Sequence, residues 1–395
     1  MSDVTGVRAR RGASTVLVVI AGLGLLLRWG IAMRSVGSTD ALIWEHFATS
    51  AARSGLPAAY LQEDGEHGVT VLNHPPLPVL WAIASLRIAQ ATRVSFAFMF
   101  KLPMLLAEMG AVFLLLRRRG PRSHAAAVGY AWSVCAILVS AYHCNTDGVC
   151  AALLLAAALT LEEQRTRLAG GLLGLAINVK LVPVLAIPAC LVAISSWRVR
   201  RSFLTSLAPW ALPFAILTAL SGPAFLRRLL GYRPISNLWG IEAFLSPGVG
   251  QGRLGPLFAS LGHAWSRGGE WVMFAAVLAA AWLSRRGGHG AVQAVFLAIG
   301  TFLLLTPGFG VQYTILVLPL FFAHDLGRAA LYGTLAGLFI GISYIDFWNG
   351  QTPWVSLFAG PYPPPAPAFG IAAWCALLAG LAHAIRPVRL RGHAL

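Results

Sequence analysis

Residues 13–33 read ASTVLVVIAGLGLLLRWGIAM, a run of about twenty residues whose apolar character is interrupted only by Arg28. A helix of this length spans the hydrocarbon core of a bilayer. Arg8, Arg10 and Arg11 precede the run, and no small-residue cleavage site clearly follows it. We therefore interpret the run as a retained signal-anchor whose N-terminus lies in the cytoplasm, rather than as a cleaved signal peptide.

The composition of the whole chain agrees with a membrane protein. The 395 residues are 57% hydrophobic and only 11% charged, with a mean hydropathy of +0.70, whereas about a quarter of the residues in soluble chains are charged. The net charge of +16 comes from arginines that form short clusters between apolar runs, as the positive-inside rule predicts. We therefore expect no nucleic-acid partner.

Twelve apolar segments predict an all-α polytopic membrane protein, a bundle of about 12 transmembrane segments that forms a single domain over residues 1–395. They lie near 13–33, 97–116, 124–142, 147–161, 168–179, 182–195, 203–220, 270–284, 291–306, 312–323, 328–345 and 368–385. The short cytoplasmic links then carry most of the 30 basic residues, which places both termini in the cytoplasm and makes this the cytoplasmic membrane. Long outer loops cover 34–96, 221–269 and the stretch from Asp346 to Pro367.

Two apolar segments are not simple spans. Residues 75–90 (PPLPVLWAIASLRIAQ) are predicted to form a juxtamembrane helix in the first outer loop, because a crossing there would turn the arginines at 117–122 outward. Residues 168–195 carry Lys180 in mid-run with Pro183 close behind. We predict two short half-spans that meet near Lys180, since broken helices are tolerated where they line a cavity.

The five cysteines lie in or beside apolar segments without the spacing of a metal site. Cys144 and Cys150 could meet, but small buried thiols are the favoured interpretation.

Asp40 follows the first span directly, in the stretch GSTDALIWEHF at 37–47. On helical spacing it shares a face with Trp44 and Phe47, while Glu45 points elsewhere. A carboxylate beside a cleft at the outer interface can act as a general base. Aspartate is also a favoured helix N-cap, and both roles remain open.

Lys101 and Lys180 are the only lysines, and both fall near the outer ends of apolar runs. An ammonium there can bind a phosphate or snorkel to the interface. Glu108 lies two helical turns after Lys101 and could be a counter-charge inside the bundle.

Other polar residues gather at the same outer level. The turn at Asn145 and Asp147 suits ordinary turn and capping chemistry, while Arg227 and Arg228 could meet lipid phosphates in general or one particular phosphate. His74, Gln312 and Tyr313 also lie at this level.

Several segments of the chain, taken together and in order, resemble the motifs of a known protein family. An outer-loop aspartate is followed by HPPL (74–77), KLPMLLAEMGAVFLLLRRRG (101–120), NTDG (145–148), LAINVKLVPVLAIP (175–188) and QYTILVLPLF (312–321). In this order they resemble the GT-C superfamily of polytopic glycosyltransferases, most nearly the bacterial family 87 and the dolichyl-phosphate-glucose glucosyltransferases.

The resemblance implies an inverting transfer of a sugar, of the hexose, mannose or pentose type, from a polyprenyl-phosphate donor to a glycan or lipid acceptor at the outer face. By this likeness Asp40 is the general base, and the donor phosphate is held by Lys101, Lys180, Arg227 and Arg228. Candidate contacts to the sugar or the acceptor are His74, Glu45, Asn145, Asp147, Gln312 and Tyr313.

The sequence departs from the family pattern at two positions. Many relatives have a paired acidic motif in the first loop, whereas Asp40 stands alone, and Glu108 replaces a more usual aspartate. We expect no cofactor, because basic side chains can replace a divalent ion when no nucleotide diphosphate needs neutralising, although these departures leave a divalent metal open.

Two other classes compete with the enzyme. A transporter or flippase would place polar residues at mid-membrane, whereas this chain gathers them near one face. A subunit that has kept the fold and lost the chemistry is the second alternative.

Overall fold

A computed structural model describes residues 2–62, 71–118, 120, 122–231, 239–245, 255–344, 354–356 and 365–386. The first part of the chain forms α1 (Ser2–Arg34), β1 (Ser35–Ser38), α2 (Thr39–Ser54), α3 (Leu56–Ala59), α4 (Pro76–Thr92) and α5 (Phe96–Arg117). Next come α6 (Ser123–Ala131), α7 (Val134–Ile137), the π-helical turn η1 (Leu138–His143), α8 (Asp147–Glu162), α9 (Thr166–Val179), the 3₁₀ turn η2 (Val182–Ala186) and α10 (Ile187–Ala193).

The last part contains α11 (Trp197–Leu207), η3 (Ala208–Ala211), α12 (Leu212–Ser221), α13 (Pro223–Leu230), α14 (Gly240–Phe244), α15 (Gly255–Arg286), α16 (Ala291–Leu305), η4 (Val311–Ile315), α17 (Leu318–His324), α18 (Leu326–Ser343), β2 (Trp354–Ser356) and α19 (Pro365–Ala384). The predicted helical, multi-pass architecture is confirmed. Most of the third predicted outer loop, between Asp346 and Pro367, lies outside the described residues.

The predicted count of about twelve spans is not confirmed. Five helices of the described chain are long and apolar enough to cross a membrane: Thr15–Arg34, Phe96–Arg117, Trp197–Ser221, Leu326–Ser343 and Pro365–Ala384. The pair Ser123–Ala131 and Val134–His143, bent by 51°, adds a sixth. Other apolar helices are shorter, and a helix of 14 residues such as α9 covers only about 21 Å of a hydrocarbon core of about 30 Å.

The break predicted near Lys180 is present. Helix α9 ends at Val179, and Lys180 adopts an extended backbone before η2 begins at Val182. Pro183 lies in the first turn of η2, where its missing N–H costs no hydrogen bond. Lys180 therefore lies outside the helical path of α9, and its side chain contacts Asp147 of α8.

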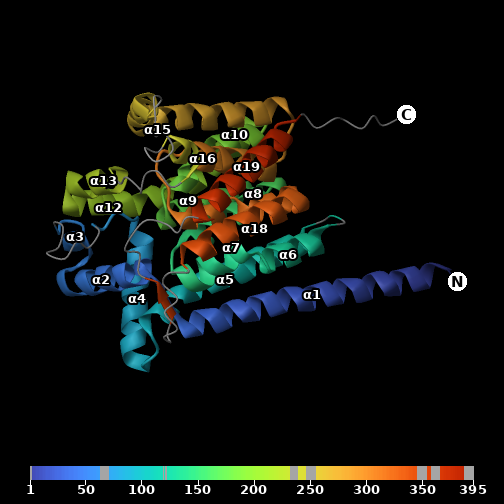
Figure 1. The fold of residues 1–395 in the computed structure, drawn as a ribbon, viewed down its shortest axis with the longest axis horizontal. Coiled ribbons are helices and arrows are strands. Elements are labelled where there is room, and N and C mark those ends of the chain that lie inside the picture. Colours follow the sequence, from blue (N-terminus) through green and yellow to red (C-terminus); the bar gives the residue numbers. More distant parts are fainter. Residues whose placement is uncertain are drawn as a thin grey trace.

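The juxtamembrane elements gather at one end of the bundle (Figure 1). There α4 runs steeply across the direction of α1 and α5, as a helix lying in the interface would; α2 lies beside it, and α3, α12 and α13 lie at the same end. The Ser221 hydroxyl donates to the carbonyl of Pro57 at 3.2 Å, which joins the first and second predicted outer loops. The start of α1 and the end of α19 lie at the opposite end of the bundle.

A short, two-stranded parallel sheet lies at the same end of the bundle as α2 and α4. Strand β1 pairs with β2, with Ser38 opposite Ser356, so the end of α1 is joined to the segment that follows α18. Gly37 lies in β1 with φ +122°, and a Cβ there would come within 2.5 Å of the Tyr142 carbonyl oxygen. Glycine is required at this position because both its backbone conformation and the close approach of η1 exclude a side chain.

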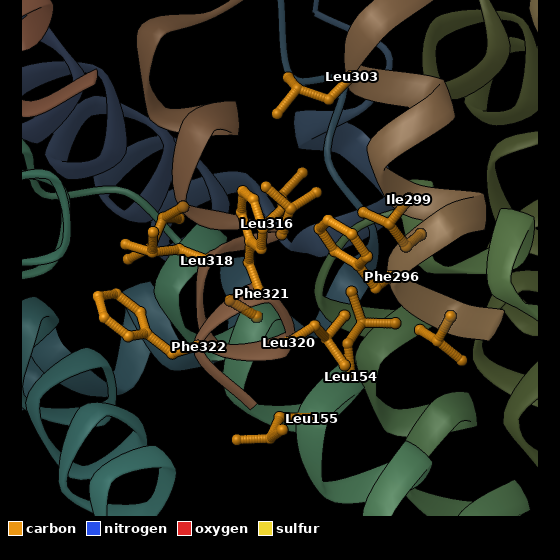
Figure 2. Close-up of a cluster of buried hydrophobic side chains, with 14 of the residues drawn as sticks. Leu154, Leu155, Phe296, Ile299, Leu303, Leu316, Leu318, Leu320, Phe321 and Phe322 are labelled. Carbon is orange, nitrogen blue, oxygen red and sulfur yellow. The ribbon is translucent and has the colours of Figure 1, made fainter. Parts of the chain in front are cut away.

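The hydrophobic core lies among α8, α16 and α17. Figure 2 shows Leu154 lying toward Phe296, with Phe321 between the helices. The Phe296 and Phe321 rings pack at 4.6 Å between centroids. Cys135, Cys144, Cys150 and Cys190 are buried free thiols, while Cys375 is free and exposed.

Candidate active site

Asp40 lies in the first turn of α2, two residues beyond the cap. The cap is Ser38, whose hydroxyl accepts from the Asp40 amide at 3.2 Å. Ser38, and not Asp40, therefore caps α2, and the Asp40 carboxylate can bind other partners. Trp44 and Phe47 are buried on the predicted face of α2, and the Asp40 side chain keeps 27% of its surface exposed.

His143, at the end of η1, and Asn145, just after it, hold the Asp40 carboxylate. His143 Nε2 lies 3.1 Å from Asp40 Oδ2, and the Asn145 side-chain amide donates to the same oxygen. The other ring nitrogen of His143 contacts the Tyr344 hydroxyl. Sequence reasoning missed His143, because only the fold brings residues 103 positions apart into contact.

Two hydrogen bonds between side chains and the backbone hold the residues around Asp40 in place. The Ser38 hydroxyl donates to the His143 carbonyl at 2.8 Å, so the α2 cap also anchors η1. The Thr146 amide donates to Asn145 Oδ1 at 2.6 Å, which orients the Asn145 amide so that its NH₂ faces Asp40. The carboxylate is thus positioned by groups that are themselves held, as a catalytic residue requires.

The surroundings keep Asp40 ionised. Burial acts to raise its pKa, but the neighbouring His143 and Asn145, with His74 farther off, outweigh burial and hold the pKa below its usual value. A carboxylate with a low pKa carries no proton at neutral pH and can accept one from a substrate hydroxyl.

Asp147 and Lys180 form a buried pair in the same region. Lys180 Nζ lies 2.7 Å from each Asp147 carboxylate oxygen. The Asp147 side chain has no exposed surface, whereas Lys180 keeps 10%. The ammonium also lies 4.2 Å from the centre of the Tyr313 ring, a favourable position for a cation over an aromatic face.

His74 lies within electrostatic reach of both groups. Burial and the nearby Lys180 lower the pKa of His74 to about 3, against a smaller opposing effect of Asp40. Its imidazole is therefore neutral. The ring packs on Trp44 at 4.6 Å, and its carbonyl accepts from the Tyr60 hydroxyl at 2.7 Å.

The fold thus brings together a set of the residues singled out in the sequence: Asp40, His74, Asn145, Asp147, Lys180 and Tyr313. Lys101 lies behind this set and is fully buried. Its ammonium donates to the carbonyl and hydroxyl of Ser35 at 2.8 and 2.9 Å, so it anchors the start of β1.

The remaining predicted contacts lie elsewhere. Glu45 points outward from α2 and is exposed, as is Arg227 on α13. Arg228 donates to the carbonyls of Leu61 and Gln62 and so fastens α13 to the first outer loop. Gln312 is half-buried and its amide lies close to Gly310.

The described part of the chain contains no group of three or more histidine, cysteine or acidic side chains placed to hold a metal ion. The expectation of no cofactor stays a prediction.

Comparison with known proteins identifies the family. The sequence model of Glycosyltransferase family 87 matches residues 75–307, more than half of the chain. The chain belongs to glycosyltransferase family 87. The match includes Asn145, Asp147 and Lys180, while Asp40 and Tyr313 lie outside it. Membership of family 87 confirms the family expected from the sequence and makes a membrane glycosyltransferase the class of protein.

Solved structures with a similar course of the chain include ArnT from Cupriavidus metallidurans. In the apo state it has 13% sequence identity and a TM-score of 0.49, with 96% of this chain and 78% of that chain covered. Bound to undecaprenyl phosphate it has 13% identity and a TM-score of 0.47, with 95% and 77% covered. A search among curated proteins finds no match.

Proposed function

We propose that this family 87 protein is an inverting glycosyltransferase. It takes a hexose, such as mannose, or a pentose from a polyprenyl-phosphate donor and passes it to a lipid- or envelope-linked acceptor. The observation that carries the proposal is the Asp40 carboxylate, which His143 and Asn145 hold in place while part of its surface stays open. Lys180 lies close enough to act electrostatically on His74, as Asp40 does.

In the proposed reaction an acceptor hydroxyl attacks the anomeric carbon while its proton passes to Asp40. The new carbon–oxygen bond forms on the face opposite the phosphate oxygen. The bond to that oxygen breaks, and polyprenyl phosphate leaves with the electron pair. A single displacement of this kind inverts the anomeric configuration, and a positioned base contributes about 10²–10⁴-fold to its rate.

Lys180 is proposed to stabilise the charge that develops on the leaving phosphate. Its ammonium has three protons, and Asp147 holds it by contacts from both carboxylate oxygens. The pair orients the cation before the donor arrives, so little reorganisation is needed when negative charge grows on the phosphate oxygen. His74, being neutral, can donate or accept a hydrogen bond at the sugar without adding charge.

An apolar cavity supports a lipid-linked donor. Its volume is about 550 Å³, and it is lined by Leu181 and by apolar side chains of α9, α10, α11, η3 and α12, among them Leu204, Trp210 and Phe214. Leu181 directly follows Lys180, so the cavity begins next to the proposed phosphate site. A chain of isoprene units matches such a lining.

The proposed orientation places the site at the outer face of the cytoplasmic membrane, with both termini in the cytoplasm. The start of α1 and the end of α19, which are the described parts nearest the two termini, lie away from α2, α3 and α4 (Figure 1). The basic residues Arg117, Arg165 and Arg286 end or begin helices and belong to the clusters expected in the cytoplasm.

A panel of donors tests the function. We expect one polyprenyl-phosphate sugar, but not polyprenyl diphosphate sugars or nucleotide sugars, to raise the unfolding temperature of the purified protein and to be consumed with acceptor. Replacing Lys180 and Asp147 together by alanine removes both charges of the pair, so the variant should fold and bind this donor about tenfold or more weakly. Unchanged donor affinity in the folded double variant would remove Lys180 from the site. Stabilisation and consumption by nucleotide sugars alone would contradict the lipid-linked donor.

The pH dependence of transfer tests His143 as a positioning residue. Since Asp40 has a lowered pKa, the wild-type rate should hold at acidic pH and fall only below the usual aspartate range. His143→Gln removes a contact that lowers the pKa of Asp40, so this pKa should rise and the acidic limb of kcat/KM should move to higher pH. His46→Gln, at an exposed position on α2, should leave the profile in place. An unshifted acidic limb in His143→Gln would show that His143 does not set the ionisation of the base.

A further inference from the structure

A second cavity lies far from the site, at the turn that joins α8 to α9. Its volume is about 570 Å³, and the start of α11 forms its other wall. Three of its lining side chains are arginines: Arg165, Arg167 and Arg198. Within the described chain no acidic side chain is among those that line it. The cavity is therefore a concentrated region of positive charge.

The helices that lead to this cavity carry it away from the site, toward the other surface of the membrane. Helix α8 starts at Asp147 in the site and has 16 residues, about 24 Å of helix. Helix α9 returns from Thr166 to the site at Lys180 over 14 residues, about 21 Å. Neither helix alone covers a hydrocarbon core of about 30 Å, but both carry the chain away from the site toward the opposite leaflet. Arginine side chains near helix ends extend to the interface, so these arginines can reach the phospholipid headgroups of that leaflet.

The arginines are open to a ligand. Arg167 Nε donates to the Ser202 hydroxyl at 3.2 Å, which holds its side chain across from α9 to α11. Arg165 lies 3.8 Å from Glu163, with more than 60% of both side chains exposed, and such pairs contribute little. Arg198 has no hydrogen-bond or ion-pair partner in the part of the chain that the structure describes.

Apolar side chains flank the arginines. Leu168 lines the cavity and is 41% exposed. Trp197, next to Arg198, is 70% exposed, and tryptophan is enriched at the level of the headgroups. A ligand for this region should therefore combine a negative head with acyl chains. An inorganic anion would use the arginines and leave Leu168 and Trp197 uncovered.

We infer that this basic pocket binds the headgroup of an anionic phospholipid from the leaflet opposite the active site. The phosphate contacts Arg167 and Arg198, and the acyl chains pass along Leu168 and Trp197. Basic pockets between membrane helices bind acidic headgroups in this way. The bound lipid joins the α8–α9 turn to α11 at the end away from the chemistry, so the inference is independent of the proposed function.

Lipid titrations of the purified full-length protein in neutral detergent test the inference. We expect phosphatidylglycerol to raise the unfolding temperature with saturation, and phosphatidylcholine to have no comparable effect. Arg167→Gln with Arg198→Gln should weaken the apparent affinity about fivefold for each arginine removed. Arg201→Gln is the matched control, because it removes an exposed charge from the same helix outside the cavity and should bind as the wild type does.

Three results would overturn the inference. The first is an unchanged phosphatidylglycerol affinity in the double variant, or in Arg198→Gln alone, which loses no contact within the protein and should fold normally. The second is equal stabilisation by phosphatidylcholine, which would indicate binding of acyl chains only. The third is equal stabilisation by inorganic phosphate at the same concentration, which would assign the pocket to a free anion.

Discussion

Asp40→Asn should reduce the rate of sugar transfer by about 10²–10⁴-fold while the protein folds and binds its donor. Asparagine keeps the shape of aspartate and one acceptor oxygen, so the contact from the Asn145 amide can persist. What it loses is the ability to take a proton from the acceptor hydroxyl. We therefore expect kcat to fall and the affinity for the polyprenyl-phosphate sugar to stay within about twofold, since no phosphate contact is removed.

Two comparisons make this result specific. Glu45→Gln removes an acid from the exposed face of the same helix and should leave transfer unchanged. Asn145→Ala takes away one contact of the Asp40 carboxylate but leaves the base itself, so its loss of activity should be smaller than that of Asp40→Asn. If Asp40→Asn transferred sugar at the wild-type rate, the base would have to be sought among other residues.

The positions of the helices could be predicted from the sequence because each apolar run ends at a strong signal. The first run ends near Arg34, and the run from Phe96 ends at Arg117, close to the predicted bounds. The break at Lys180 could also be predicted, since a charge and Pro183 cannot continue an apolar span. The number of full crossings could not, because a short apolar helix can cross partly or pack inside the bundle.

Part of the site was also predictable from its residue types. Asp40, Asp147 and Lys180 are rare charges in an apolar chain, and such groups at membrane depth are usually functional. Histidine carries less information, because His143 has no unusual sequence neighbours and becomes informative only through its contact with Asp40. Which partner a charged side chain contacts depends on how the helices cross. The spacing of residues along one helix does not predict this crossing.

Glu108 illustrates this limit. The sequence suggested that Glu108 is a counter-charge inside the bundle, and it is one, but its partner is not Lys101, which contacts Ser35. The carboxylate of Glu108 instead lies 3.1 Å from Arg28 of α1, and neither side chain has any exposed surface. The Tyr130 hydroxyl donates to Glu108 at 2.9 Å, and Arg28 donates to the Tyr130 carbonyl at 2.9 Å. The one charge in the opening apolar run is thus the group that fastens α1 to α5 and α6.

Glu108→Ala should therefore lower the free energy of unfolding by about 3–5 kcal/mol, because it leaves Arg28 charged and unpaired in the bundle. SDS titration of the purified protein measures the change. Arg28→Met combined with Glu108→Leu removes both charges and keeps the volume filled, so it should recover most of the loss. Leu106→Ala, at a position of α5 that is 58% exposed, should change stability by less than about 0.5 kcal/mol. If Glu108→Ala were as stable as Leu106→Ala, the pair would not hold α1 in place, and α1 would have to be held by apolar packing alone.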